Sequence, residues 1–319
     1  MEGVRGDYQV IEDRSSLKVE LKYSGDQADQ HLISLYDLSQ ALYGFERSLA
    51  LTTHLVLNDE VITQATALRG AEILCFAPRA GSVSIVAAIG LLATGAYKLT
   101  TLKADNPLGH LIHSAYDFAV HKVTGQPLDY DKSMRQLYEE GRYEKALGLK
   151  LPRESQFDSL AEKIEPPLTK MHRPIVRSQT AGAAEIFFSS ELSAKPRVIN
   201  FNRDTYAKMK YRTRLDQIHP VEAKVAVFNP NTQNGRIFVS EHERTIPFYL
   251  TPAGRSTEAY RLIGESYSKN LNNREDDNAF LVFDVLEVKS KLGRTTKYQV
   301  VKVRPRESAD AEFDLIENF

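Results

Sequence analysis

The second half of the sequence alternates apolar and polar residues in three short runs, then has helical spacing, then alternates again in two runs. A period of two buries one side of a β-strand, whereas apolar residues three and four positions apart bury one side of a helix. We expect strands at 221–227, 236–240, 245–250, 280–289 and 296–303, and a helix at 256–270. This order predicts a small five-stranded OB-like β-barrel, with the helix closing one end.

The first half predicts a mixed domain of strands and helices. Residues 17–23 alternate as a strand, and Ser34 followed by Asp37 is typical of a helix start before the apolar spacing of 35–56. Two apolar runs, 72–77 and 82–87, flank a segment with Pro and Gly and predict a β-hairpin. A further apolar helix is expected after Pro107. The fold class is therefore α+β.

A chain of 319 residues suggests two domains. Prolines at 152, 166, 167 and 174 interrupt the middle of the chain, where we place the boundary. We predict an N-terminal α+β domain over 1–150, a Pro-punctuated connector over 151–194, the barrel over 195–305 and an acidic tail over 306–319.

Positive and negative charges balance over the whole chain, with Lys+Arg 41 and Asp+Glu 42, so any electrostatic function must be local. The single cysteine, Cys75, lies in an apolar run and predicts a buried thiol in a reducing compartment. The residues after Met1 do not read as a secretory signal. We therefore expect a cytoplasmic protein.

The barrel strands present a candidate binding face. If Ile237 and Val239 point inward, Arg236 and Phe238 point outward, and the same alternation places Tyr249 outside. Aromatic rings stack on bases and cations meet phosphates, which is what single-stranded nucleic acid requires. The alternative is that this face packs against the N-terminal domain or a second subunit, since aromatics and Arg are also enriched in protein interfaces.

A basic segment with interleaved aromatics precedes the barrel, and the loop at 291–296 is also basic. Such a pattern predicts a polyanion site, although a solvated basic helix face has the same composition. The predicted ligand-binding residues are Arg197, Arg203, Lys208, Lys210, Tyr211, Arg212, Arg214, Arg236, Phe238, Tyr249, Lys291 and Arg294.

Residues 80–97 contain no formal charge and approach the length that spans a bilayer. One interpretation is a buried strand followed by a core helix. The other is a segment whose small residues pack in or on the inner membrane, which would make the protein peripheral to it.

The motifs of common enzyme families are missing from the sequence: a phosphate-binding Gly-rich loop, a dinucleotide Gly fingerprint, an HExxH pair and a Gly-x-Ser-x-Gly elbow. His110, His113, Asp117 and His121 recur at helical spacing, but they spread over about 16 Å, too far to share one metal ion. We therefore predict no enzyme activity, no catalytic residues, no metal and no cofactor.

Residues 76–86, Phe-Ala-Pro-Arg-Ala-Gly-Ser-Val-Ser-Ile-Val, resemble the N-terminal region of uncharacterised bacterial proteins associated with phage defence, and 235–239 with 244–248 are similar to their small β-barrel. The resemblance implies a non-enzymatic, homo-oligomeric antiviral effector controlled by a partner protein or a nucleotide-derived signal. Its barrel would sense an anionic oligonucleotide, and its apolar segment would disturb the membrane. The alternative is a nucleic-acid-binding module with no membrane role.

Overall fold

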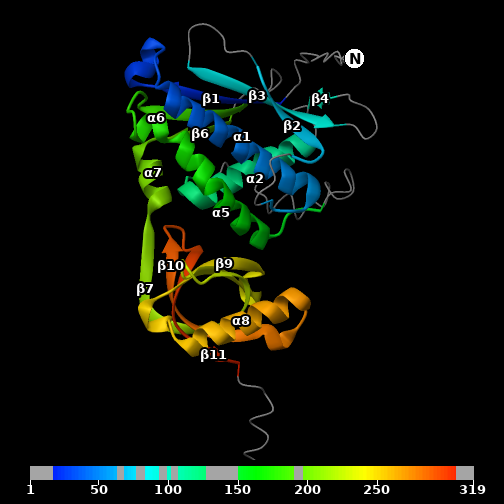
Figure 1. The fold of residues 1–319 in the computed structure, drawn as a ribbon. Helices are drawn as coiled ribbons and strands as arrows, with labels where there is room; N and C mark the ends of the chain where they lie inside the picture. The colour runs from blue at the N-terminus through cyan, green and yellow to red at the C-terminus, as the bar shows by residue number, and fades with distance from the viewer. Residues whose placement is uncertain are drawn as a thin grey trace, which may run out of the picture. The chain divides into compact units, whose positions relative to one another are not determined.

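The computed structural model describes residues 17–62, 68–76, 83–92, 99–101, 107–126, 150–189 and 197–306. The chain divides into two compact units, Met1–Lys210 (unit 1) and Tyr211–Phe319 (unit 2). Unit 1 combines helices with a six-stranded sheet, and unit 2 contains a closed five-stranded barrel (Figure 1). The predicted α+β class is confirmed.

The sheet of unit 1 has the order β2-β3-β1-β5-β6, and β4 also pairs with β3. Its strands are β1 (Lys18–Ser24), β2 (Ala71–Cys75), β3 (Ser84–Leu92), β4 (Leu99–Thr101), β5 (Ala183–Ser189) and β6 (Arg197–Phe201). The helices are α1 (Leu35–Asn58), α2 (Pro107–Thr124), α5 (Glu154–Met171), α6 (Arg173–Val176) and α7 (Arg203–Lys210), with a short 3-10 helix at Asp26–Gln30. One buried cluster joins the inner side of β1, including Val19 and Leu21, to α1, α2 and α5.

Several local predictions for unit 1 are confirmed. The Ser34 side chain accepts a hydrogen bond from the backbone N–H of Asp37 at 3.4 Å, so α1 begins at the predicted cap. The strands of the expected hairpin, β2 and β3, pair in antiparallel register from Ala71↔Leu91 to Cys75↔Ala87. The turn between these two strands lies outside the described residues.

The stretch 151–194 differs from the expected connector. It supplies α5, α6 and β5, and β5 lies beside β1 inside the sheet of unit 1. Pro166 and Pro167 lie within α5, where a proline costs a backbone hydrogen bond. Burial of residues such as Leu160, Ile164 and Leu168 offsets that cost, so tertiary packing outweighs the local breaker signal. The units meet at Lys210 and Tyr211 rather than near residues 150 and 195.

Where the structure describes it, the apolar run at 80–97 forms the buried strand of its first interpretation, and this strand continues to Leu92. Residues 84–92 form β3, with β1 along one edge and β2 along the other. Ala88 and Ile89 are fully buried there, whereas 80–82 and 93–97 lie outside the described residues. Among the helices that are described, none has the combined length and apolar character to cross a bilayer.

Cys75 is exposed, so the prediction of a buried thiol is wrong. The residue ends β2, a strand at one edge of the sheet, and its Sγ donates to the carbonyl of Phe76 at 3.3 Å. Apolar neighbours in the sequence indicate a strand, but they do not show that its last residue lies at a sheet edge.

Unit 2 has the predicted sequence of elements. Its strands are β7 (Arg212–Asn229), β8 (Asn234–Val239), β9 (Arg244–Leu250), β10 (Phe280–Ser290) and β11 (Thr295–Pro305). Helix α8 (Thr257–Asn272) lies between the third and fourth strands, and 3-10 turns occur at Ser240–His242, Pro252–Gly254 and Asp277–Ala279. The strands close in the order β10-β11-β9-β8-β7, with β9 and β11 parallel and the other pairs antiparallel. The OB-like barrel is confirmed.

Side chains such as Ile237, Phe248 and Phe283 fill the barrel interior and are fully buried. Helix α8 is fastened to the barrel by the Ser266 hydroxyl, which accepts from the Val225 N–H at 2.9 Å and donates to the Ala279 carbonyl at 2.6 Å. The packed interior therefore holds the outward-pointing side chains of β8 and β9 in defined positions.

Candidate nucleic-acid interface

Strands β8 and β9 turn one row of side chains into the barrel and the other outward. Ile237 and Val239 are buried, so Arg236 and Phe238 between and beside them point away from the core. Tyr249 likewise lies between the buried Phe248 and Leu250. The orientations expected from the alternation are thus those of the structure.

Lys224 of β7 lies between two aromatic rings contributed by neighbouring strands. It is paired in register with Phe238 of β8 and with Phe280 of β10. Its Nζ is 5.7 Å from the centre of the Phe238 ring and 5.2 Å from that of Phe280, within cation–π range. The ammonium also donates to the backbone carbonyl of Arg274. Only 8% of Lys224 is exposed, because its aliphatic stem is covered.

Tyr249 has two cations near its ring. The Lys297 Nζ lies 5.2 Å from the ring centre, and the Arg255 guanidinium carbon lies 5.5 Å from it. Arg255 also donates to the Tyr249 hydroxyl and, from Nε, to the Leu250 carbonyl at 3.2 Å. These contacts hold the ring and both cations in one place.

Arg236 lies between the two clusters. Its Nε donates to the Thr245 hydroxyl at 3.1 Å and its Nη2 to the Thr245 carbonyl at 2.8 Å. Thr245 is in register with Phe238 and lies four residues before Tyr249, so Arg236 links the surroundings of both rings. We name this surface the cation–aromatic face; it comprises Lys224, Arg236, Phe238, Tyr249, Arg255, Phe280 and Lys297. The sequence predicted Arg236, Phe238 and Tyr249. It did not predict Lys224, Arg255, Phe280 and Lys297, because strand pairing and the turn after β9 bring these residues to the face.

The loop with Lys291 and Arg294 lies at a different end of the barrel. The parallel register of β9 and β11 aligns Phe248 with Tyr298, so the start of β11 lies alongside Arg244, at the opposite end of β9 from Tyr249. Arg244 is 5% exposed and donates from Nη2 to the Thr295 carbonyl at 2.6 Å. The structure therefore does not bring Lys291 and Arg294 next to Tyr249.

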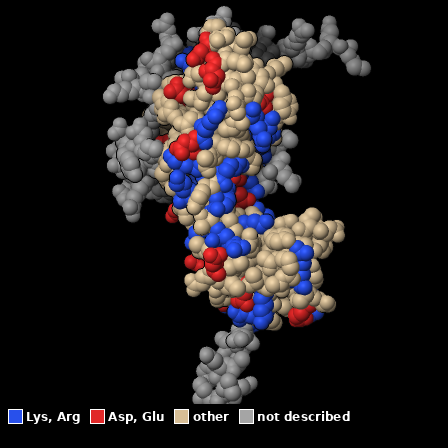
Figure 2. Space-filling model, turned by 90° about the vertical axis from the view of Figure 1, so that its left-hand side faces the viewer, with Lys and Arg blue, Asp and Glu red and all other residues tan. Residues whose placement is uncertain are grey.

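The predicted basic segment is divided between the units. Arg197 in β6 and Arg203, Lys208 and Lys210 in α7 belong to unit 1, whereas Tyr211, Arg212 and Arg214 begin unit 2. Acidic neighbours offset several of the cations: Lys208 pairs with Asp204 at 2.5 Å, Lys210 with Glu165 at 3.6 Å and Arg214 with Asp216 at 3.3 Å. Figure 2 shows red atoms interspersed among the blue on each unit. Within each unit, the charge of the segment is thus partly neutralised by acidic side chains.

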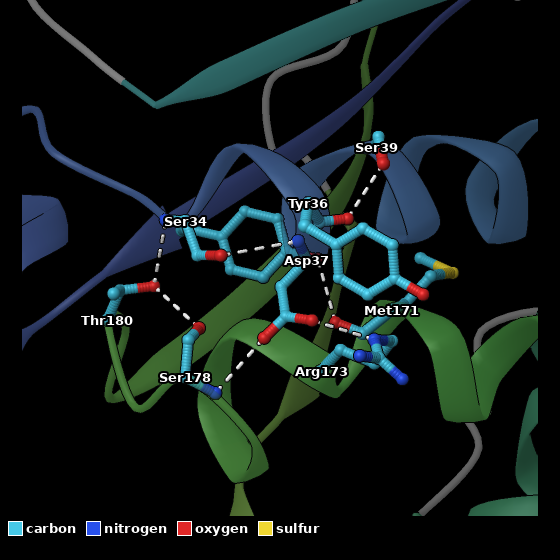
Figure 3. Close-up of polar contacts among 9 residues, drawn as sticks. Ser34, Tyr36, Asp37, Ser39, Met171, Arg173, Ser178 and Thr180 are labelled. Carbon is cyan, nitrogen blue, oxygen red and sulfur yellow. Dashed lines mark hydrogen bonds and ion pairs between the residues drawn. The ribbon is translucent and has the colours of Figure 1, made fainter.

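Asp37, at the start of α1, is 4% exposed and accepts two hydrogen bonds from outside its own helix. Arg173 donates from Nε to Oδ1 at 2.8 Å, and the Ser178 N–H donates to Oδ2 at 3.0 Å (Figure 3). Burial alone would raise the pKa of Asp37, but the bonds from Ser178 and the Arg173 charge hold that pKa below its usual value. This cluster fastens α1 to α6.

The same region exposes apolar and aromatic side chains. In α1, Leu35 is 81% exposed, Tyr36 65% and Tyr43 53%. The Arg173 guanidinium carbon lies 5.1 Å from the Tyr36 ring centre, and the Lys170 Nζ lies 4.1 Å from that of Tyr43. Exposed aromatics beside cations are a composition that protein interfaces favour.

The histidines of α2 do not converge. His113 stacks on Phe188, with ring centres 4.2 Å apart, while His110 is exposed and the His121 ring contacts the Gln126 carbonyl. Within the part of the chain that the structure describes, no group of three or more His, Cys, Asp or Glu side chains is arranged to hold a metal ion.

A known family model matches much of unit 1. The family model described as a domain of unknown function (DUF7946) matches residues 19–208, more than half of the chain. No curated protein matches the chain, and no solved structure does. The matched residues end within unit 1, so the cation–aromatic face lies outside them. Through residues 19–208, the chain belongs to the DUF7946 family.

Proposed function

We propose that this protein binds a single-stranded oligonucleotide through the cation–aromatic face of its barrel. The observation that supports the proposal is the pairing of cations with outward rings on β8 and β9, the second and third strands of the barrel. Oligonucleotides bind OB-folds over these two strands. Each stacked base contributes about 1–3 kcal/mol, and nearby cations meet phosphates without base preference.

The wider interpretation stays a prediction from sequence. It comprises a role in antiviral defence, a partner protein from the same system, homo-oligomers and contact with the membrane through residues 80–97. For the last of these, the consecutive residues Ala88 and Ile89 point to opposite faces of β3 and both are buried, so a lipid contact through β3 would require unit 1 to open. For homo-oligomers, the exposed side of α1 with Leu35, Tyr36 and Tyr43 is the surface of unit 1 that best fits a subunit contact.

The test is a titration of the full chain with fluorescein-labelled oligo(dT) and oligo(U), followed by fluorescence anisotropy. Phe238→Ala and Tyr249→Ala should each weaken binding by about 5- to 150-fold, the loss of one stacked base. Tyr267→Ala is the matched control, because Tyr267 is an exposed aromatic of α8 outside the face. Its affinity should equal that of the unmodified chain.

The proposal is wrong if neither oligonucleotide binds, or if both ring variants bind as tightly as the control. A change of solution mass in the ring variants, with no oligonucleotide binding, would instead favour the alternative that this face is a subunit contact.

A further inference from the structure

The chain leaves the barrel beside the cation–aromatic face. Arg306, directly after β11, forms an ion pair with Glu222 of β7, with 3.3 Å between Arg306 Nε and Glu222 Oε2. Its guanidinium carbon lies 6.0 Å from the centre of the Phe280 ring, one of the two rings around Lys224. Residues that follow Arg306 therefore start at one end of this face.

The sequence of 307–319, which lies outside the described residues, has the opposite charge to the face. It contains no Lys or Arg, and its acidic residues are Glu307, Asp310, Glu312, Asp314 and Glu317. Two rings, Phe313 and Phe319, are interspersed with these carboxylates. Negative charges alternating with flat rings are the chemistry that the face would meet in an oligonucleotide.

We propose that residues 307–319 occupy the cation–aromatic face of their own barrel and compete there with the oligonucleotide. The competition with an oligonucleotide rests on the proposed function, whereas the contact between residues 307–319 and the face does not depend on it. Carboxylates of the segment would lie against Arg236, Arg255 and Lys297, and a Phe ring would take the place of a base.

The length of the segment is sufficient. Thirteen residues extend at most about 43 Å. The row from Phe280 across Lys224 and Phe238 to Thr245 crosses three strand spacings, about 14 Å. Attachment to the barrel also gives the segment an effective concentration of about 1 mM, so a contact with a dissociation constant near ~0.1 mM is occupied in about nine of ten molecules.

The first experiment compares oligo(dT) affinities of the full chain, a chain ending at Arg306, and a Glu312→Gln/Asp314→Asn double variant. Removal of the segment should tighten binding about tenfold, and the double variant should tighten it less. The matched control is Glu154→Gln/Asp204→Asn, which removes the same charges from exposed positions of unit 1, outside the barrel. In both altered chains, the gain in oligo(dT) affinity should exceed that of the control variant and should diminish at high salt. If the full chain binds oligo(dT) and removal of the segment leaves the affinity unchanged, the proposed competition is wrong.

The second experiment needs no oligonucleotide. In a Cys75→Ser background, Asn318→Cys receives a nitroxide label, and paramagnetic broadening of backbone amide signals is measured in the full chain. The proposal predicts broadening at Phe238 and Tyr249 that diminishes at high salt, because the contact is between opposite charges. Without broadening at the two rings the contact is absent and the inference fails, whatever the titrations give. If no variant binds oligo(dT) but broadening is seen, the contact stands while the proposed function falls.

Discussion

The ammonium of Lys297 lies 5.2 Å from the centre of the Tyr249 ring, across the parallel pair of strands β11 and β9. Arg255 approaches the same ring from the segment that follows β9. A ring next to two cations can meet both a base and its phosphates, so the charges and the ring should contribute to binding in different ways. Salt dependence separates the two contributions.

Lys297→Gln and Arg255→Gln should each lower the slope of log Kd against log salt concentration by about 0.7, because each removes one phosphate contact with a single strand. Anisotropy titrations between low and moderate salt measure this slope. Lys22→Gln, at an exposed position of β1 in unit 1, should leave it unchanged. Equal slopes in all three variants would mean that phosphates do not contact these side chains.

Gly235→Ala should destabilise the barrel. A Cβ at this position would lie 2.4 Å from both the Phe248 ring and the Val227 carbonyl oxygen, so the core must shift. Overpacking of this kind costs about 1–3 kcal/mol, measurable by urea unfolding. Gly264→Ala is the matched control, because a Cβ there meets nothing within 4 Å and helix propensity should stabilise α8 by about 1 kcal/mol. A neutral Gly235→Ala would contradict the packing described for β8.

Asp37→Asn should lower the free energy of unfolding of unit 1 by about 2 kcal/mol, because it removes a charged hydrogen-bond acceptor from the partly buried Arg173. Asp204→Asn removes an exposed carboxylate from an ion pair within α7, which should cost no more than about 0.5 kcal/mol. Urea unfolding followed by amide signals of unit 1 compares the two. Similar losses in both variants would show that the Asp37 cluster adds little.

Unit 1 should lose stability as the pH falls from about 6.5 to about 4, and the buried His172 contributes to this loss. The ring is fully buried between the Leu168 carbonyl, 2.8 Å from Nδ1, and the Thr205 hydroxyl, 2.9 Å from Nε2. Burial lowers the pKa of His172 to about 4. In this pH window the unfolded chain binds a proton that the folded chain does not, so acid favours unfolding.

The expected loss from His172 is about 2 kcal/mol between pH 7.5 and pH 5. His172→Gln should be less stable at pH 7.5 but should lack this part of the pH dependence, whereas His31→Gln, at an exposed position, should keep it. Urea midpoints of unit 1 at the two pH values provide the measurement. If His172→Gln and the unmodified chain have parallel pH profiles, the buried ring does not titrate as described.

The sequence indicated the barrel because its signals are local. Alternation in residues 236–240 and 245–250 depends only on strand geometry, so it also showed that Arg236, Phe238 and Tyr249 point outward. In unit 1, local sequence features such as prolines indicated breaks that tertiary packing overrides. Pro166 predicted a break where α5 continues, because the helix buries enough apolar surface to offset a missing hydrogen bond.

Length, apolar periodicity and caps by themselves determined two structural units, the order of strands and helices in the barrel, and the side of a strand on which each residue lies. The tertiary structure alone decided which cation meets which ring. Lys224 reaches Phe280 through the register of β7 with β10, and Lys297 reaches Tyr249 through the pairing of β11 with β9. Register between strands distant in sequence depends on the packed core and the closure of the barrel, and no window of neighbouring residues contains that information.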